Sequence, residues 1–222
     1  MAEPYKSPRR AGPRAKTADA PGTPAQAREL RAQGRKTMRR LLDAGMRVFA
    51  ERGFHAARVD DIVRAARTSH GTFYLYFANK EDLLRALAVE CAHEMDALAD
   101  GVAAITPDEA GAEELRRFLA AFFTTYRRYG PVIRAWMEGH VADREATQLG
   151  VHAFTDIATA LGRRMREAGV PGDAATISAL MALLERAAYF LVSRRLDFDG
   201  DTLLDSVTLV VHRGFFGAEV TA

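Results

Sequence analysis

The segment FAERGFHAARVDDIVRAARTSHGTFYLYFANKEDLL, residues 49–84, alternates between short helical patterns and breaks. Gly53 is a natural helix stop, because glycine adopts the left-handed conformation of a helix C-terminus without strain. Residues 59–66 then form a short apolar pattern, and RTS at 67–69 interrupts it. Ser69 can cap a second short helix, HGTFYLYF, with its hydroxyl group. The segment therefore predicts two short helices joined by a tight turn.

Longer helical patterns flank this pair. Upstream, apolar residues recur at helical spacing from about Gly34 to Gly53, which predicts a helix of about five turns. Downstream, Asn79 can cap a helix with Asp82 as its capping partner, and an apolar stripe continues for about six turns to Val102. A helix of this length beside a small basic unit is expected to connect that unit to a second domain.

One helix followed by two short ones is the plan of a helix-turn-helix unit, in which the last helix enters the major groove of DNA. Such a unit needs apolar side chains between its helices, polar side chains early in the last helix, and cations around it. The apolar set is Ile62, Ala65, Ala66, Phe73 and Phe77; the polar set is Ser69, His70 and Thr72; the cationic set is Arg58, Arg64, Arg67 and Lys80. Together the three sets predict a DNA-binding unit near residues 58–77.

The same segment closely resembles the DNA-binding signature of TetR/AcrR-type regulators. The matching residues are Phe49, Gly53, Phe54, Ile62, Ala65, Ala66, Ser69, Gly71, Tyr74, Phe77, Lys80, Glu81 and Leu83. The resemblance implies an all-α, tetracycline-repressor-like fold: an N-terminal tri-helical helix-turn-helix domain and a C-terminal helical ligand-binding and dimerisation domain. It covers the first helix to the start of the fourth, and the rest of the chain resembles the family only in being helical, apolar and of suitable length.

The resemblance also implies roles for single residues. In that family the residues matching Tyr74 and Lys80 contact DNA phosphates, and the residues matching Ser69, His70, Thr72 and Phe73 lie at the groove. The predicted DNA-binding set is Arg58, Arg67, Ser69, His70, Thr72, Phe73, Tyr74 and Lys80. Family members form dimers through their last two helices. Many hold a small ligand whose binding moves the long fourth helix and separates the recognition helices.

Two residues depart from the family pattern. The usual turn is Ala-Gly-Val-Ser, whereas residues 66–69 read ARTS, so Arg67 replaces the glycine. Arginine is strained at positive φ, so either the turn is strained or its shape differs. Arg58 stands where the family often has a capping threonine, which removes a cap contributing about 1 kcal/mol but adds a cation beside the DNA.

Charge is divided unevenly along the 222 residues. Residues 1–80 contain 17 lysines and arginines against 7 acids, and residues 81–222 contain 14 against 22, so only the first part suits a polyanion. Residues 1–33 hold five of the eight prolines and few large apolar side chains, which predicts a disordered basic arm. The single cysteine, Cys91, is expected to be a buried core thiol and excludes an internal disulfide.

Residues 34–80 are thus the predicted DNA-binding domain, and residues 81–222 are expected to form a helical regulatory and dimerisation domain. No apolar run in the sequence approaches the ~18 residues of a membrane span. A last helix is expected over Leu203 to Phe216. The expected breaks lie at Pro107, Gly111, Gly130–Pro131, Leu149–Gly150, residues 168–173 and residues 197–201.

Aromatic and methionine side chains of the second domain could line a cavity or simply fill its core. The predicted pocket residues are Phe122, Tyr126, Trp136, Met137, His140, Phe154, Met181 and Tyr189. The last two helices carry more apolar surface than one small bundle needs to bury, which predicts a two-fold dimer and a palindromic operator. The predicted dimer-face residues are Leu184, Leu191, Val207, Val210, Val211 and Phe215.

These features predict a cytoplasmic repressor that binds double-stranded operator DNA as a homodimer and is released by a small, lipophilic ligand. No cofactor, metal or membrane is expected, and the spacing of His140, Asp143, Glu145 and His152 matches no metal site. The alternative is an effector-independent DNA-binding protein that acts architecturally or through a protein partner, whose second domain would have a filled core. An enzyme would need converging titratable groups, and the sequence shows none.

Overall fold

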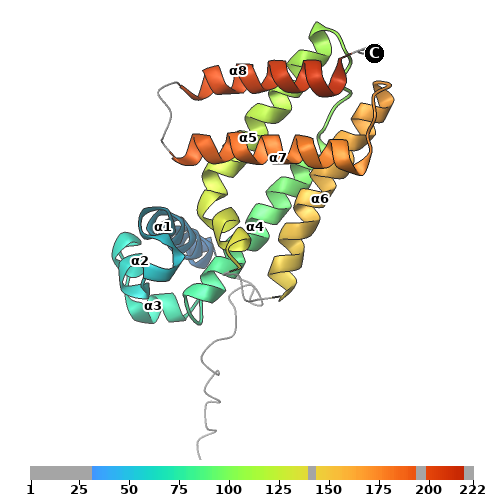
Figure 1. The fold of residues 1–222 in the computed structure, drawn as a ribbon. Helices are drawn as coiled ribbons and strands as arrows, with labels where there is room; N and C mark the ends of the chain where they lie inside the picture. The colour runs from blue at the N-terminus through green and yellow to red at the C-terminus, as the bar shows by residue number, and fades with distance from the viewer. Residues whose placement is uncertain (1–31, 140–143, 194–198, 218–222) are drawn as a thin grey trace, which may run out of the picture.

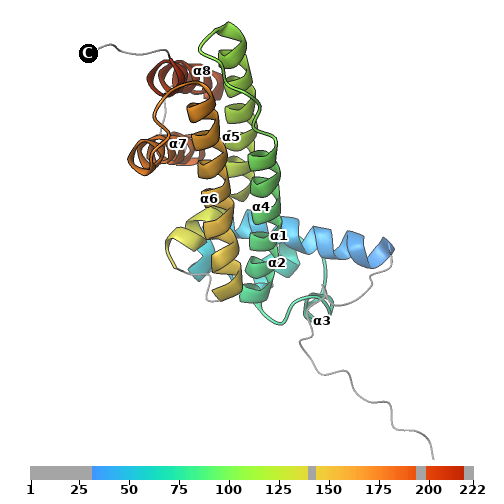
Figure 2. The same cartoon turned by 90° about the vertical axis from the view of Figure 1, so that its right-hand side faces the viewer.

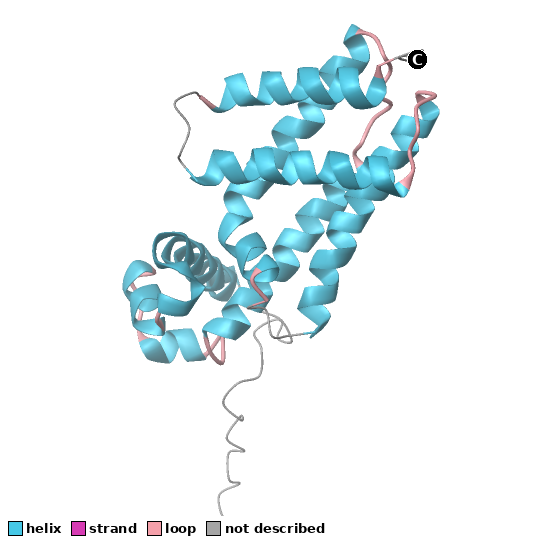
Figure 3. Ribbon diagram, viewed as in Figure 1, coloured by secondary structure: helices cyan, strands magenta, loops and turns pink. Residues whose placement is uncertain are grey.

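The computed structural model describes residues 32–139, 144–193 and 199–217. Within these ranges the chain is helical and has no strand, in agreement with the all-α prediction (Figure 3). The predicted basic arm lies almost wholly outside the described residues, as do His140 and Asp143.

The first three helices form the predicted tri-helical head, and they are α1 (Ala32–Ala56), α2 (Val59–Ala65) and α3 (His70–Tyr74). Gly53 has φ 73° and ψ 162°, so regular helical geometry stops there, as the sequence predicted, before one further turn. The head is joined to the long helix α4 (Lys80–Asp100). Asn79 caps the N-terminus of α4, because its side-chain oxygen accepts a hydrogen bond from the Asp82 backbone N–H at 2.8 Å. The predicted helix pair, its turn and the following cap are therefore confirmed.

The remaining helices form the body of the molecule. They are α5 (Glu109–Met137), α6 (Arg144–Glu167), α7 (Ala174–Ser193) and α8 (Gly200–Val211), with a π-helical turn η2 (His212–Phe216) continuing α8. In Figures 1 and 2 the head lies at one end of the molecule, α4, α5 and α6 run lengthwise, and α7 and α8 lie side by side across the other end. Helices α4, α5 and α6 thus separate the tri-helical head from α7 and α8 (Figures 1 and 2).

Helix α5 corrects one predicted boundary, because it continues through Pro131 for 29 residues. A proline inside a helix lacks the N–H that would bond the carbonyl four residues earlier, and this cost led us to expect a break. The buried face continues on both sides of the proline, with Tyr126 and Tyr129 before it and Val132 and Ile133 after it. Packing of this face offsets the lost hydrogen bond.

Gly150 corrects a second boundary. We expected an interruption at Leu149–Gly150, but both residues lie inside α6, and the break instead falls between Met137 and Arg144. A Cβ atom on Gly150 would lie 2.8 Å from the indole ring of Trp136. The glycine is therefore explained by close packing of α6 on α5 and not by a turn.

Two contacts fix the head to the body. Arg39 of α1 donates to Glu90 of α4 at 2.7 Å and also pairs with Asp43. A Cβ on Gly45 would lie 2.4 Å from Leu83 Cδ2, so α1 and α4 approach closely at this glycine. Further along α4, Cys91 is fully buried, as predicted, and burial raises the pKa of its thiol.

Candidate nucleic-acid interface and small-molecule pocket

The turn between α2 and α3 is a strained helix stop. Thr68 N–H donates to the Val63 carbonyl at 3.0 Å and Arg67 N–H to the Arg64 carbonyl at 3.1 Å, the two bonds of a Schellman motif. Such a motif places one residue in the left-handed region, and here Arg67 adopts φ 50°. The first of the two alternatives for this turn is therefore correct: arginine tolerates a backbone conformation that glycine would adopt without strain.

Helix α3 is short, and two local features hold it in place. Ser69 Oγ accepts from the Thr72 backbone N–H at 3.1 Å, which is the predicted N-cap. Phe73 and Phe77 are buried beneath the helix, with exposed fractions of 0% and 2%. The helix is thereby fixed to the head by one face only, and its other face is left open.

The open face carries most of the predicted DNA-binding side chains. Tyr74 is 52% exposed, and its ring packs edge-on against Phe73. Thr72 is half-buried, and the exposed members of the set are Arg58, Arg67, Ser69, His70 and Tyr74. Phe73 is the exception and a correction: its fully buried side chain holds the helices together and cannot reach DNA.

Arg58 precedes α2 and provides no side-chain cap, in agreement with the sequence analysis. Its backbone N–H instead donates to Asp61 Oδ2 at 3.3 Å. Asp61 Oδ1 also lies 3.6 Å from a guanidinium nitrogen of Arg52 and from one of Arg64. Asp61 therefore acts inside the head, as an anchor for the start of α2.

Lys80 has a different environment from the one predicted for a phosphate ligand. Its ammonium group donates to the backbone carbonyls of Phe54, His55 and Ala57 at 2.9, 3.1 and 3.0 Å. It also lies 4.7 Å from the centre of the Phe54 ring. A lysine ammonium has three N–H donors, and all three are used. Lys80 thus closes the end of α1, where the negative end of the helix dipole favours a cation.

His70 and Asp60 connect the two short helices on the exposed face. His70 Nε2 lies 2.7 Å from Asp60 Oδ1, and both side chains are more than half exposed. The hydrogen bond from His70 is the main reason that the pKa of the Asp60 carboxyl lies below its usual value. Asp60 was not among the predicted DNA-binding residues.

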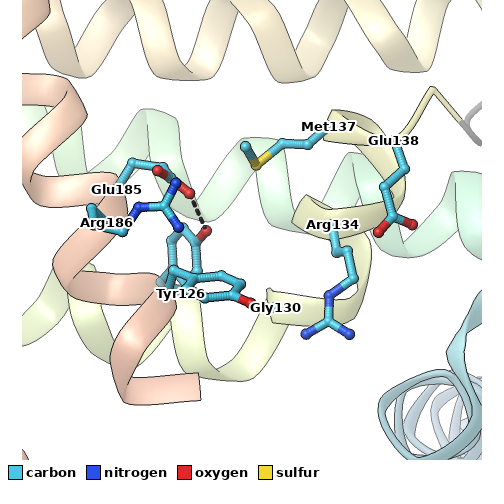
Figure 4. Close-up of a pocket in the computed structure, with 8 residues that line it drawn as sticks. Tyr126, Gly130, Arg134, Met137, Glu138, Glu185 and Arg186 are labelled. Atoms are coloured by element: carbon cyan, nitrogen blue, oxygen red, sulfur yellow. Dashed lines mark hydrogen bonds between the residues drawn. The ribbon is translucent and has the colours of Figure 1, made fainter. Parts of the chain in front are cut away.

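A pocket of about 390 Å³ opens between α5 and α7 (Figure 4). Its lining is amphipathic, with Tyr126, Gly130, Arg134, Met137 and Glu138 from α5 and the following residue, and Glu185, Arg186 and Tyr189 from α7. Tyr126 donates to Glu185 at 3.4 Å, and the Arg186 guanidinium lies 5.1 Å from the centre of the Tyr189 ring. Burial raises the pKa of Tyr126, with Glu185 adding to the effect.

The structure brings together only part of the predicted pocket set. Tyr126, Met137 and Tyr189 line the pocket, whereas Phe122 is fully buried in the core between α5 and its neighbours. The remaining described members, Trp136, Phe154 and Met181, pack partly buried against that core. The sequence analysis missed three charged side chains, Arg134, Glu185 and Arg186, because a search for apolar residues gives them no signal.

A second cavity, also of about 390 Å³, is an open groove along α7 and α8. It is almost wholly apolar and is lined by Leu183, Arg186, Ala187, Phe190, Leu203, Ser206, Val207 and Val210. Phe190, Leu209 and Val210 are large apolar side chains exposed beside it, by 39%, 51% and 55%. This surface is defined here as the α7–α8 face.

Three predicted dimer-face residues need correction. Leu184 and Val211 are buried within the protomer, and Phe215 packs against its core. Val207 is mostly buried as well, but it lines the groove. Leu191 is also partly buried, and Val210 alone of the predicted set is prominently exposed. The apolar stripes of these helices are wide enough to face both inward and outward, so periodicity alone did not separate the two sides.

Helix α7 is unusual in composition. Residues 174–191 form a window with mean hydropathy 1.4, and 22% of the window is buried inside the protomer. By length and composition this helix could cross a membrane, contrary to the expectation that no apolar run would be long enough. Glu185 and Arg186 interrupt the window and line the pocket between α5 and α7, so the helix is polar on that side.

Sequence relatives match the head. The family described as bacterial regulatory proteins, tetR family, matches residues 41–87. The fatty acid metabolism regulator protein of Bacillus subtilis (strain 168) is 43% identical over 58 residues, which are 26% of this chain and 30% of that protein. The transcriptional regulator UidR of Escherichia coli (strain K12) is 29% identical over 100 residues, 39% of this chain and 51% of that one. The chain thus matches about a third of the length of the first of these relatives and about half of the second.

Solved structures extend the likeness to the whole fold. A tetR-family regulatory protein from Rhodococcus RHA1 has a TM-score of 0.65 at 20% identity, covering 83% of this chain and 99% of that one. The transcriptional regulator FadR from Bacillus subtilis, solved in complex with stearoyl-CoA, has a TM-score of 0.57 at 20% identity, covering 79% and 98%. The head of this chain therefore matches the DNA-binding part of the tetR family of bacterial regulatory proteins over residues 41–87, and the whole chain shares the fold of solved TetR-family regulators.

Proposed function

We propose that this TetR-family regulator is a repressor that binds a palindromic operator as a homodimer and is released by a small amphipathic ligand. The DNA-binding part of this proposal rests on the open face of α3. Its buried side is fixed by Phe73 and Phe77, and its outer side presents Ser69, His70 and Tyr74 beside Arg67. A rigid helix with polar side chains in a basic head suits the major groove.

DNA binding can be tested without knowing the operator. The purified protein is used to select duplexes from a pool with a randomised centre, and the enriched sequences are titrated by fluorescence anisotropy over a series of salt concentrations. We expect a palindromic sequence, because a two-fold dimer presents two equal recognition helices. A protein that enriches no sequence and binds no duplex at low salt contradicts this part of the proposal.

Tyr74→Phe tests the phosphate contact implied by the family resemblance. Loss of one hydroxyl bonded to a charged group weakens binding by about tenfold, and by the same factor for all sequences. Tyr76→Phe is the matched control, because Tyr76 lies two residues later and is partly buried against the core. Equal effects of the two substitutions would contradict a role for the Tyr74 hydroxyl.

The effector part of the proposal is supported by the α5–α7 pocket. Its volume of about 390 Å³ falls within the range of small-molecule sites, which favours ligand sensing over the effector-independent alternative. The lining refines the expected ligand class: Met137 and two tyrosines suit an apolar body, and Arg134 and Arg186 suit an anionic group. The stearoyl-CoA bound by the Bacillus subtilis FadR is also an amphipathic anion, which agrees with this class.

Thermal-shift measurements with medium-chain fatty acids and aromatic carboxylates test the pocket. A carboxylate that binds the native state raises the melting temperature and releases the labelled operator. Arg134→Met should abolish both effects, whereas Arg163→Met, an exposed arginine of α6 outside the pocket, should preserve them. DNA binding that no such ligand changes would favour the effector-independent alternative.

The homodimer part is supported by the α7–α8 face. An apolar groove with three large exposed apolar side chains is unfavourable in water and is expected to be covered. A second copy of the same face would cover it around a two-fold axis and would orient two heads for one operator.

A further inference from the structure

The Asp60–His70 pair occupies an unexpected place on the head. It joins the first turn of α2 to the first residue of α3, with 2.7 Å between Oδ1 and Nε2. The side chains are 65% and 54% exposed, and exposed ion pairs contribute little to stability. Their neighbours on the same surface are Ser69 and Thr72, which the proposed function places at the groove. The pair therefore lies where bases would be read.

A carboxylate at this surface has an electrostatic cost. Phosphates repel it, and it stays ionised because the hydrogen bond from His70, with the charges of His70, Arg64 and Arg58, keeps its pKa low. These three side chains are the charged groups that act on Asp60. Because neighbouring groups offset part of its charge, this carboxylate can approach DNA, which would repel an isolated carboxylate.

The chemistry of the carboxylate limits what it can recognise. An ionised carboxylate only accepts hydrogen bonds. In the major groove cytosine presents the N4 amino donor, whereas guanine presents only acceptors and thymine an acceptor and a methyl group. Adenine places its amino donor beside the N7 acceptor, which repels a carboxylate. Oδ1 of Asp60 is bonded to His70, and Oδ2 has no hydrogen bond within the described residues.

We propose that Asp60 is a specificity-determining residue, which reads a cytosine amino group through Oδ2 while His70 holds the carboxylate in place and offsets its charge. This inference rests on the proposed function, since it assigns one base position within the operator. His70 then acts chiefly as a positioning residue for Asp60 and not as an independent base contact.

The positioning role of His70 can be tested separately from its charge. His70→Gln can still donate a hydrogen bond to Asp60. It should therefore keep the preference for cytosine, whereas His70→Ala, which removes the donor, should weaken that preference.

The test compares duplexes selected from a randomised pool by the wild-type chain, Asp60→Ala and Asp60→Asn. The wild type should enrich cytosine at one symmetry-related position in each half-site. Replacing this cytosine with another base should weaken binding by about tenfold. Asp60→Ala should lose the preference at that position alone. Asp60→Asn should change it towards adenine, because an asparagine amide pairs with adenine N6 and N7. Glu51→Gln, an exposed acid of α1, serves as the control and should change no position.

Two outcomes overturn the inference and remain distinct from failure of the proposed function. If Asp60→Ala keeps every base preference and tightens binding to all duplexes equally, Asp60 only repels DNA. If His70→Ala keeps the full preference for cytosine, His70 does not hold the Asp60 carboxylate in place. Failure of the wild-type chain to enrich any sequence would instead contradict DNA binding as such.

Discussion

At the residue scale, Lys80 shows how a side chain far along the sequence can complete a helix end. Its three hydrogen bonds reach back to Phe54, His55 and Ala57, more than twenty residues earlier. Nothing in the local sequence around Lys80 indicates these partners, because they are backbone atoms brought close by the fold. The predicted phosphate role came from family resemblance, and the structure instead supports a role in stability.

Lys80→Met should lower the stability of the head. The substitution removes three hydrogen bonds from a charged donor at the end of α1, and for this partly exposed group we expect a loss of about 1–2 kcal/mol in the free energy of unfolding. The melting temperature should then fall by about 3–6 °C in circular dichroism. Lys36→Met, which removes an exposed lysine of α1, is the control and should have little effect. An unchanged melting temperature with a reduced salt dependence of DNA binding would restore the phosphate role.

Arg67→Gly should stabilise the fold while weakening DNA binding. A non-glycine residue in the left-handed region costs about 1–2 kcal/mol, which the substitution removes. Glycine also raises the entropy of the unfolded chain, and this offsets about half of the stabilisation. We therefore expect a gain of about 0.5–1 kcal/mol in denaturant unfolding. If Arg67 contacts a phosphate, the slope of log affinity against log salt should fall by about 0.9. Arg67→Ala separates the two effects, since it removes the charge and keeps the strained backbone; an equal gain in stability for Arg67→Ala would refute the strain argument.

At the element scale, helix starts were easier to predict than helix interruptions. Ser69 and Asn79 carry a capping side chain in the sequence itself, and both caps form. Pro131 and Gly150 also stand out in the sequence, yet both lie inside helices because of packing on other elements. Local chemistry thus predicted the head well, whereas the body depends on contacts between helices that no local pattern contains.

Three helices of the body start with an aspartate that should make their stability depend on pH. Asp108, Asp173 and Asp199 each accept backbone N–H bonds at the start of α5, α7 and α8. The pKa of each carboxyl lies below its usual value, for Asp108 chiefly because the Thr106 hydroxyl donates to it, and for Asp173 and Asp199 chiefly because of the backbone N–H bonds. Because the folded pKa is depressed, the stabilisation is present above the unfolded value of about 3.8 and is lost as the pH falls through the folded pKa.

Thermal melts between pH 5.5 and 2.5 check this prediction. The triple substitution of Asp108, Asp173 and Asp199 to Asn keeps an oxygen acceptor at each cap but removes its titration. The melting temperature of this variant should decline less steeply below pH 4 than that of the wild type. If the melting temperatures of both proteins fall equally steeply, other carboxylates cause the loss of stability at low pH.

At the scale of the whole molecule, the α7–α8 face was predicted as a surface but not residue by residue. Both helices are apolar on more than one side, so the sequence could not tell which members pack inward. The structure separates Val210 and Leu209, which are exposed, from Leu184 and Val211, which are buried. The proposed dimer contacts therefore move to the exposed members together with Phe190.

Val210→Asp should weaken dimerisation without unfolding the protomer. Placing a carboxylate in an apolar interface leaves it desolvated without a partner, so we expect the dimer dissociation constant to rise by tenfold or more. Val151→Asp is a matched control, because Val151 is 60% exposed on α6, away from the α7–α8 face. Light scattering after size-exclusion chromatography measures both. A Val210→Asp protein as dimeric as Val151→Asp would place the interface elsewhere.

Arg186 belongs to the walls of both the small-molecule pocket and the apolar groove. A ligand that draws the Arg186 guanidinium towards α5 would change the groove to which a second copy of the chain binds. Conversely, binding of the second copy would change the position of the guanidinium in the ligand pocket. Thermodynamic reciprocity then requires each event to alter the other by an equal factor. The apparent affinity for an effector would consequently vary with protein concentration, so the abundance of the regulator would itself tune its sensitivity.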